Sequence, residues 1–161
     1  MIARIILALL SVGLLASIAQ ARDSLGVYDD WGAFRDPEIP RCYAISRPSR
    51  NRAGEWEPFA SVGNWPDSDR RGQVHFRLRR DLGDDGQPIL TIGSRNFELI
   101  GRGPDAWAAS SRDDAAIVAA MRSGATMRIE ARSRRTGRFV DNYSLSGAAS
   151  AIDAAALGCA G

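Results

Sequence analysis

The single histidine, His75, limits the chemistry that this sequence can perform. With one imidazole, a metal site built on two histidines is excluded, and any Ser-His-Asp or Cys-His arrangement has to use this residue. The chain contains no lysine, which excludes a phosphate loop with its lysine, a Schiff-base enzyme and a Ser-x-x-Lys nucleophile. We therefore expect no catalytic residues, no metal site and no cofactor. A hydrolase that uses His75 with a carboxylate or a serine is the alternative from another class.

Serines near the C-terminus do not have the setting of a nucleophile. Ser144 is not preceded by the glycine of a G-x-S-x-G turn, because Asn142 and Tyr143 stand before it. Ser146 comes directly before an alanine-rich run, and a serine in that position is typical of a helix N-cap. The pattern predicts a strand that ends near residue 145 and a short helix over residues 148–157, capped by Ser146.

Arginines gather in two segments that alternate like strands. Arg128, Arg132 and Arg135 lie in one predicted hairpin, and Arg77 and Arg79 lie in another. If the two hairpins are neighbours, these arginines form a patch for carboxylate or phosphate groups of an envelope lipid, a polysaccharide or a partner protein. The alternative is a solvated face that nearby acidic residues balance.

The two cysteines, Cys42 and Cys159, are predicted to form a disulfide. Their number is even, and the N-terminus described next directs the chain to an oxidising compartment. Closing so long a loop would stabilise the fold by about 4–5 kcal/mol in the loop-entropy treatment. Two free, buried thiols are the alternative.

The N-terminus reads as a secretory signal peptide. One arginine precedes an apolar run from Ile5 to Ile18, and Ala19-Gln20-Ala21 forms a small-x-small cleavage site. The run is shorter than the roughly 20 residues of a membrane span, so we expect cleavage after Ala21 and no span afterwards. A buried N-terminal helix or an uncleaved anchor is the alternative. The predicted location is the periplasm or the outside of the cell.

The mature chain, residues 22–161, is long enough for one domain with a sizeable core. Its net charge falls from +2 to +1, because Arg4 is removed with the signal peptide. Phosphate binding along a nucleic acid needs a clear basic excess. Nucleic acid is therefore not an expected partner.

Periodicity predicts an all-β sandwich with two short helices near the C-terminus. The helix before the last hairpin starts at the capping residue Ser111 and ends at Gly124. Residues 22–40 read as turns, and residues 47–72 as a long connection with a short strand near Phe59 to Gly63. The tryptophans of this connection either cover the core or form an exposed recognition surface. The other strands are expected at 41–46, 73–80, 88–94, 96–101, 125–132 and 138–145.

The strand at residues 73–80 alternates cleanly and is expected to form a hairpin with residues 88–94. One face carries Val74, Phe76 and Leu78, and the other carries His75, Arg77 and Arg79.

Residues 115–159 resemble the closing segment of the invasion-associated locus B family. That segment is a helix, a small-residue turn, a strand, a hairpin and then "SL-x-G" before an alanine-rich helix. The matching residues are Met121, Gly124, Met127, Ile129, Ser144, Leu145, Gly147, Ala151 and Ala155. The resemblance implies an immunoglobulin-like β-sandwich in the periplasm or envelope of a Gram-negative bacterium, without enzymatic activity.

We therefore expect an exported, non-enzymatic envelope protein that acts through binding or structural support. Its partner would be an envelope protein or an anionic envelope component. The second hypothesis is a binder of an anionic glycan, a lipid or a small ligand through the arginine-rich hairpins. No motif for host-cell invasion can be matched in this chain.

Overall fold

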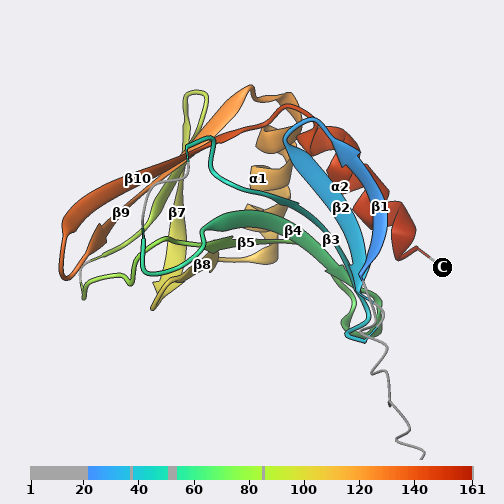
Figure 1. Cartoon of the computed structure of the whole chain (residues 1–161), viewed down its shortest axis with the longest axis horizontal. Coiled ribbons are helices and arrows are strands. Elements are labelled where there is room, and N and C mark those ends of the chain that lie inside the picture. Colours follow the sequence, from blue (N-terminus) through green and yellow to red (C-terminus); the bar gives the residue numbers. More distant parts are fainter. Residues whose placement is uncertain (1–21, 37, 51–53, 85, 161) are drawn as a thin grey trace, which may run out of the picture.

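The computed structural model of the chain describes residues 22–36, 38–50, 54–84 and 86–160, and the predicted signal peptide lies outside them. Ten strands and two α-helices form in the described residues (Figure 1). The first five strands are β1 (Asp23–Tyr28), β2 (Trp31–Asp36), β3 (Arg41–Ser46), β4 (Phe59–Trp65) and β5 (Arg70–Arg77). The rest are β6 (Ile89–Ile92), β7 (Arg95–Arg102), β8 (Asp105–Ala108), β9 (Thr126–Ser133) and β10 (Gly137–Ser144). The helices are α1 (Ser111–Ser123) and α2 (Ala148–Gly158), and a single 3-10 turn spans Pro66–Ser68.

All strand pairs are antiparallel, in the order β1-β2-β3-β4-β5-β8-β7-β6-β9-β10. β7 joins two groups of strands, because its first half pairs with β6 and its second half with β8. β1 to β5 and β8 form the first layer. β6, β9 and β10, with the two helices beside them, form the second layer (Figure 1). The predicted class, an all-β sandwich with two short helices near the C-terminus, is confirmed.

One hydrophobic core lies between the layers. α2 packs on β1, β2 and β3, while α1 packs on β5 and β8. Trp31 is almost fully buried, and its indole N–H donates to the main-chain oxygen of Ser144 at 2.9 Å, which ties β2 to the end of β10. The largest buried side chains around it include Tyr143, Phe76, Leu78, Leu90, Ile117, Met121, Met127 and Ile129.

The predicted alternation in β5 and β9 is confirmed. Val74 and Phe76 are buried while His75 between them is partly exposed, and β9 alternates in the same way. The predicted hairpin of β5 with β6 is wrong, since β5 pairs with β4 and β8 while β6 pairs with β7 and β9. The segment between β5 and β6 instead crosses to the second layer, where the Gly83 N–H donates to the Arg132 oxygen at 2.9 Å.

The N-terminal part contains more strand than the sequence predicted. β1 and β2 form a hairpin within residues predicted to be turns, and the β4 strand predicted near Phe59 extends to Trp65. The charged and turn-forming residues of this part led the sequence analysis to predict turns in place of the hairpin. Only Trp31 and Ala33 of β2 are buried apolar side chains, which gives a weak periodic signal.

Both helices begin differently from the prediction. The N-cap of α1 is Ser110, one residue earlier than expected, and its hydroxyl oxygen accepts from the Asp113 N–H. The N-cap of α2 is Gly147 without a side-chain cap, because Ser146 donates its hydroxyl to Asp29 at 2.8 Å. Neither described helix combines the length and the apolar character that crossing a membrane requires.

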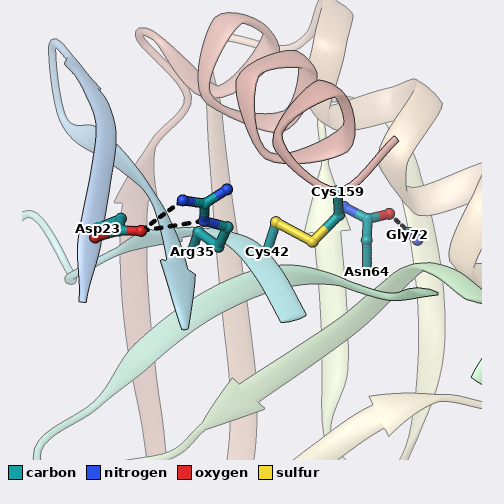
Figure 2. The surroundings of a disulfide bond; sticks show 6 residues. All are labelled: Asp23, Arg35, Cys42, Asn64, Gly72 and Cys159. Carbon is teal, nitrogen blue, oxygen red and sulfur yellow. Dashed lines mark hydrogen bonds and ion pairs between the residues drawn. A yellow bond between two sulfur atoms is a disulfide. The ribbon is translucent and has the colours of Figure 1, made fainter. Parts of the chain in front are cut away.

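The predicted disulfide between Cys42 and Cys159 is present (Figure 2). It joins β3 to the residue that follows α2, with the two Cα atoms 5.7 Å apart. Because the two cysteines are 117 positions apart in the sequence, the bond fixes the end of the fold to its third strand.

Candidate functional site

The outer face of the first layer carries a continuous row of residues that crosses seven strands. Each member is the direct cross-strand partner of the next. The two ends of the row are apolar and open to solvent, with Val27 73% and Ile100 56% exposed. We call this set the outer row. It consists of Val27, Gly32, Ile45, Ser61, His75, Trp107 and Ile100.

Aromatic rings lie flat beside the outer row because two glycines leave room for them. A Cβ atom on Gly32 would lie 2.8 Å from the Phe34 ring, and one on Gly63 would lie 2.6 Å from the Trp65 ring. Rings therefore cover the backbone at both glycines, an arrangement known to protect glycines in sheets. This outer face presents ring surface where sandwiches usually present polar side chains.

Polar groups at the centre of the row form a small network around Asp105. Oδ1 of Asp105 lies 2.8 Å from Nε2 of His75 and accepts from Nε of Arg77 at 2.7 Å. The His75 ring stacks on Trp107, with ring centroids 5.2 Å apart and planes 13° apart, and meets Phe59 edge-on. All three members of the network are partly exposed, so a ligand on this face can reach them.

A groove of about 840 Å³ opens over the β1 side of the same face. Its floor includes the row members Gly32 and Ile45, and rings of Phe34 and Phe59 line it. Its other walls come from the loops that flank β3 and β4. The outer row and this groove form one continuous surface, since they share residues.

The serine hydroxyl beside His75 is not directed at its imidazole. Ser61 is the cross-strand neighbour of His75, but its hydroxyl donates to the main-chain oxygen of His75 at 3.3 Å. β5 is an interior strand, and where it lies between β4 and β8 its main-chain N–H groups pair within the sheet; the Val74 N–H donates to Asp114. Within the described residues, no group of three or more His, Cys, Asp or Glu side chains could hold a metal ion.

The arginines that the sequence grouped lie in different places. Arg77 is on the outer face of the first layer, where it pairs with Asp105 and covers the Trp56 ring. Arg79 is buried between the layers with Asp141. An alternating pattern predicts the direction of side chains only within a strand. β5 ends at Arg77, so the pattern does not extend to Arg79, whose side chain points into the core.

The other three predicted arginines belong to the second layer. Arg128 and Arg132 are exposed on the outer face of β9, and Arg135 lies in the following turn, where it pairs with Glu55. β5 and β9 are not neighbours, because β8, β7 and β6 stand between them in the sheet. Arg79 is buried, and Arg77 lies on the other layer from Arg128 and Arg132, so the five arginines do not form one exposed patch.

The sequence predicted that His75 of the outer row and the neighbouring Arg77 point outward, but it did not predict that the row exists. Trp107 and Ile100 belong to short strands whose pairing with β5 was not evident. The available signal was the pair Tyr43 and Ile45, which share one face of β3 opposite the buried Cys42. Two apolar residues on an outward face indicate a surface with a role beyond solvation.

No family model matches this chain, and neither the curated proteins nor the solved structures contain a significant match to it.

Proposed function

We propose that this chain is an exported, non-enzymatic protein of the bacterial cell envelope that acts by binding, through the outer row and its groove. The observation that carries the proposal is the outer row itself. It places Ile45, His75 and Trp107 in register across the sheet, with exposed apolar residues at both ends. Apolar and aromatic side chains gathered on one solvent face of a sheet are a feature of binding surfaces.

Three observations support export. The first is the disulfide between Cys42 and Cys159, a bond that persists in oxidising compartments. The second is the signal-like N-terminus, with cleavage proposed after Ala21. The third is the resemblance of residues 115–159 to the invasion-associated locus B family, to which we propose the chain is related. We place the mature protein in the periplasm or outside the cell.

Cell fractionation tests the export proposal. We expect the protein in the periplasmic or secreted fraction, with an intact mass that starts at Arg22. A protein recovered from the cytosol that still starts at Met1 would refute it. The same mass measurement, after alkylation without reductant, should show no labelled cysteine.

Sedimentation with isolated envelope tests the binding proposal. The purified protein is mixed with envelope fragments of the native organism, and the bound fraction is compared between variants. We expect Val27→Ser combined with Ile100→Ser to reduce binding, because it removes the exposed ends of the outer row. Leu157→Ser is the matched control, since Leu157 is equally exposed but lies on α2. Equal binding by all three proteins would refute the role of the row.

The hydrolase alternative rests on His75 and is tested directly. His75→Ala is compared with the unchanged protein on ester, amide and glycoside substrates. We expect neither protein to hydrolyse them. An activity that the unchanged protein has and the folded variant lacks would replace the binding proposal with an enzyme.

A second candidate function is recognition of an anion through Arg128. Thr91 and Asn142 are its cross-strand neighbours, and these residues line a pocket of about 350 Å³. Arg128 has no acidic partner in the part of the chain that the structure describes. Arg128→Gln should weaken retention on carboxylated or phosphorylated envelope material if this candidate is correct, and unchanged retention would exclude it.

A further inference from the structure

We propose that the outer row binds a linear, predominantly neutral glycan, with sugar rings lying on the aromatic side chains beside the row. This inference rests on the proposed function and names the class of ligand. Two properties of the face carry it: flat ring surface at defined positions, and hydrogen-bonding groups whose charges are already matched.

The first property is flatness. Phe34 lies over Gly32 and Trp65 lies over Gly63, so both rings lie along the sheet instead of standing away from it. A sugar ring has a face of C–H groups and a rim of hydroxyls. Its C–H face is apolar and can lie against an aromatic face, where burial of both surfaces is favourable.

The second property is the network around Asp105. Asp105 offers acceptor oxygens, Arg77 offers donors, and Ser61 offers a hydroxyl, all within reach of the row. Hydroxyls of a sugar both donate and accept, so they match a mixture of this kind. Arg77 is neutralised by Asp105, and Arg41, which covers the Tyr43 ring, is paired with Asp36. These two pairs leave little net charge at the centre of the row to select an anionic ligand over a neutral one. Arg70, which lies over the Trp65 ring and donates to the Ser68 hydroxyl, is a cation near the row that has no acidic partner in the described residues.

A peptide fits this face less well. Peptides that bind sheets add to an edge strand, where main-chain groups are free to pair. The outer row crosses β2, β3, β4, β5 and β8, which are all interior strands. A peptide lying on their ring surfaces would lose water from its own amide groups without gaining partners, at a cost in free energy. A glycan avoids this cost because its polar groups lie at the rim of each ring.

The length of the row indicates a chain of several sugars. Neighbouring strands lie about 4.8 Å apart, so six steps from Val27 to Ile100 span roughly 29 Å. The groove of about 840 Å³ over Gly32 and Ile45 gives one part of this path walls on its sides. A single sugar would cover only a fraction of the surface.

Calorimetry with soluble oligosaccharides tests the inference on the full exported chain. The probes are chitohexaose and cellohexaose as neutral chains, a hyaluronan hexasaccharide as an anionic chain, and an apolar decapeptide. We expect at least one neutral hexasaccharide to bind. Phe34→Ala should weaken that binding about tenfold, the effect of losing a stacked ring with its buried area. Trp107→Ala should weaken it by a smaller factor, because one face of the Trp107 ring is already stacked on His75. Leu157→Ala should leave it unchanged. Purified peptidoglycan sacculi in a sedimentation assay then distinguish wall glycan from other polysaccharides.

Replacing a partly buried ring can also disturb the fold. Ile100→Ser avoids this difficulty, because Ile100 is mostly exposed. It should weaken binding of the neutral hexasaccharide more than binding of the matching disaccharide, chitobiose or cellobiose, since only the longer chain reaches the end of the row. Thermal melting checks that each variant is folded.

Four outcomes would overturn the inference. The first is tight binding of the decapeptide while the glycans do not bind, and the second is binding of the hyaluronan hexasaccharide that the row variants do not change. The third is an equal effect of Ile100→Ser on long and short sugar chains. The fourth is that no sugar binds. If envelope fragments still bind in a row-dependent manner while soluble glycans and sacculi do not, the ligand class is wrong and the proposed function stands. If the row variants leave envelope binding unchanged, both are wrong.

Discussion

Arg79 and Asp141 form an ion pair that is buried between the two layers of the sandwich. Nε of Arg79 lies 3.3 Å from Oδ1 of Asp141, and the side chains are only 7% and 3% exposed. Nη2 of Arg79 also donates to the main-chain oxygen of Val140 at 3.2 Å. Burial, together with the charge of Asp141, raises the pKa of the nearby Tyr143 hydroxyl far above its usual range. The two charges are therefore tolerated in the core only as a pair.

Asp141→Asn should lower the free energy of unfolding by about 3–5 kcal/mol, because it leaves the Arg79 charge buried without its partner. Urea denaturation measures the change. The exposed pair of Arg134 and Asp84 is the control, and Asp84→Asn should cost about 0–1 kcal/mol. The double variant Arg79→Met, Asp141→Leu should recover most of the loss, since no charge remains. If Asp141→Asn is as stable as the unchanged protein, the ion pair of Arg79 and Asp141 does not stabilise the fold.

Removing the disulfide should weaken the fold strongly. Replacing Cys42 and Cys159 with serine should lower the free energy of unfolding by about 4–5 kcal/mol, because the unfolded chain regains the freedom of a very long loop. Thermal melting with and without reductant measures this. Reductant should lower the melting temperature of the unchanged protein and leave that of the double variant alone. Identical responses in the two proteins would mean that the bond does not hold the fold.

Gly147 occupies a position that no other residue fits. Its φ is +82°, and a Cβ atom there would lie 1.9 Å from the main-chain oxygen of Tyr28. Gly93 has φ +58° but open space around it, which makes it a matched control. Gly93→Ala should cost about 1–2 kcal/mol, the strain of a left-handed backbone alone. Gly147→Ala should cost clearly more in the same urea experiment, because the turn before α2 has to move. Equal losses at the two positions would contradict this close contact.

Local patterns in the sequence predicted the parts of the fold that local forces determine. Alternation placed Val74 and Phe76 in the core, and the hairpin of β9 and β10 followed from two alternating segments around a turn. The disulfide followed from compartment and cysteine count. The pairing of β5 was predicted wrongly because the turn-like residues after it resemble a hairpin loop. Their main-chain N–H groups instead bond to Gly103, between β7 and β8, and to Arg132 of β9, which are contacts between segments distant in the sequence.

The candidate site was predictable only in part, for a related reason. Alternation indicated that His75 points outward, but it carries no information on which residues become its neighbours across the sheet. Asp105 and Trp107 come close to His75 only because β8 pairs with β5. Register between strands depends on the whole set of contacts in the layer. Arg79 shows the same limit, since its place was decided by Asp141 on a strand of the other layer.

Asp114 links the start of α1 to β5 and gives the protein a pH-dependent contact. Its Oδ1 accepts from the Val74 N–H at 2.8 Å, at a point where β8 no longer pairs with β5. Burial and the neighbouring Asp113 raise the pKa of Asp114 above its usual value, although the Val74 N–H acts in the opposite direction. The folded state therefore binds this proton more tightly than the unfolded state. The resulting stabilisation is complete below the unfolded pKa and is lost as the pH rises through the folded pKa.

Asp114→Asn keeps an acceptor for Val74 and removes the titration. As the pH rises from about 4 to about 7, we expect the unfolding free energy of the Asn variant to increase relative to that of the unchanged protein. The reason is that only the unchanged protein has to bury a charge. Urea denaturation at a series of pH values measures the shift. Asp114→Ala is the control. It also removes the titration but leaves the buried Val74 N–H without an acceptor, so it should be about 1–3 kcal/mol less stable than the Asn variant at every pH. A difference between the Asn variant and the unchanged protein that stays constant with pH would mean that folding does not raise the pKa of Asp114.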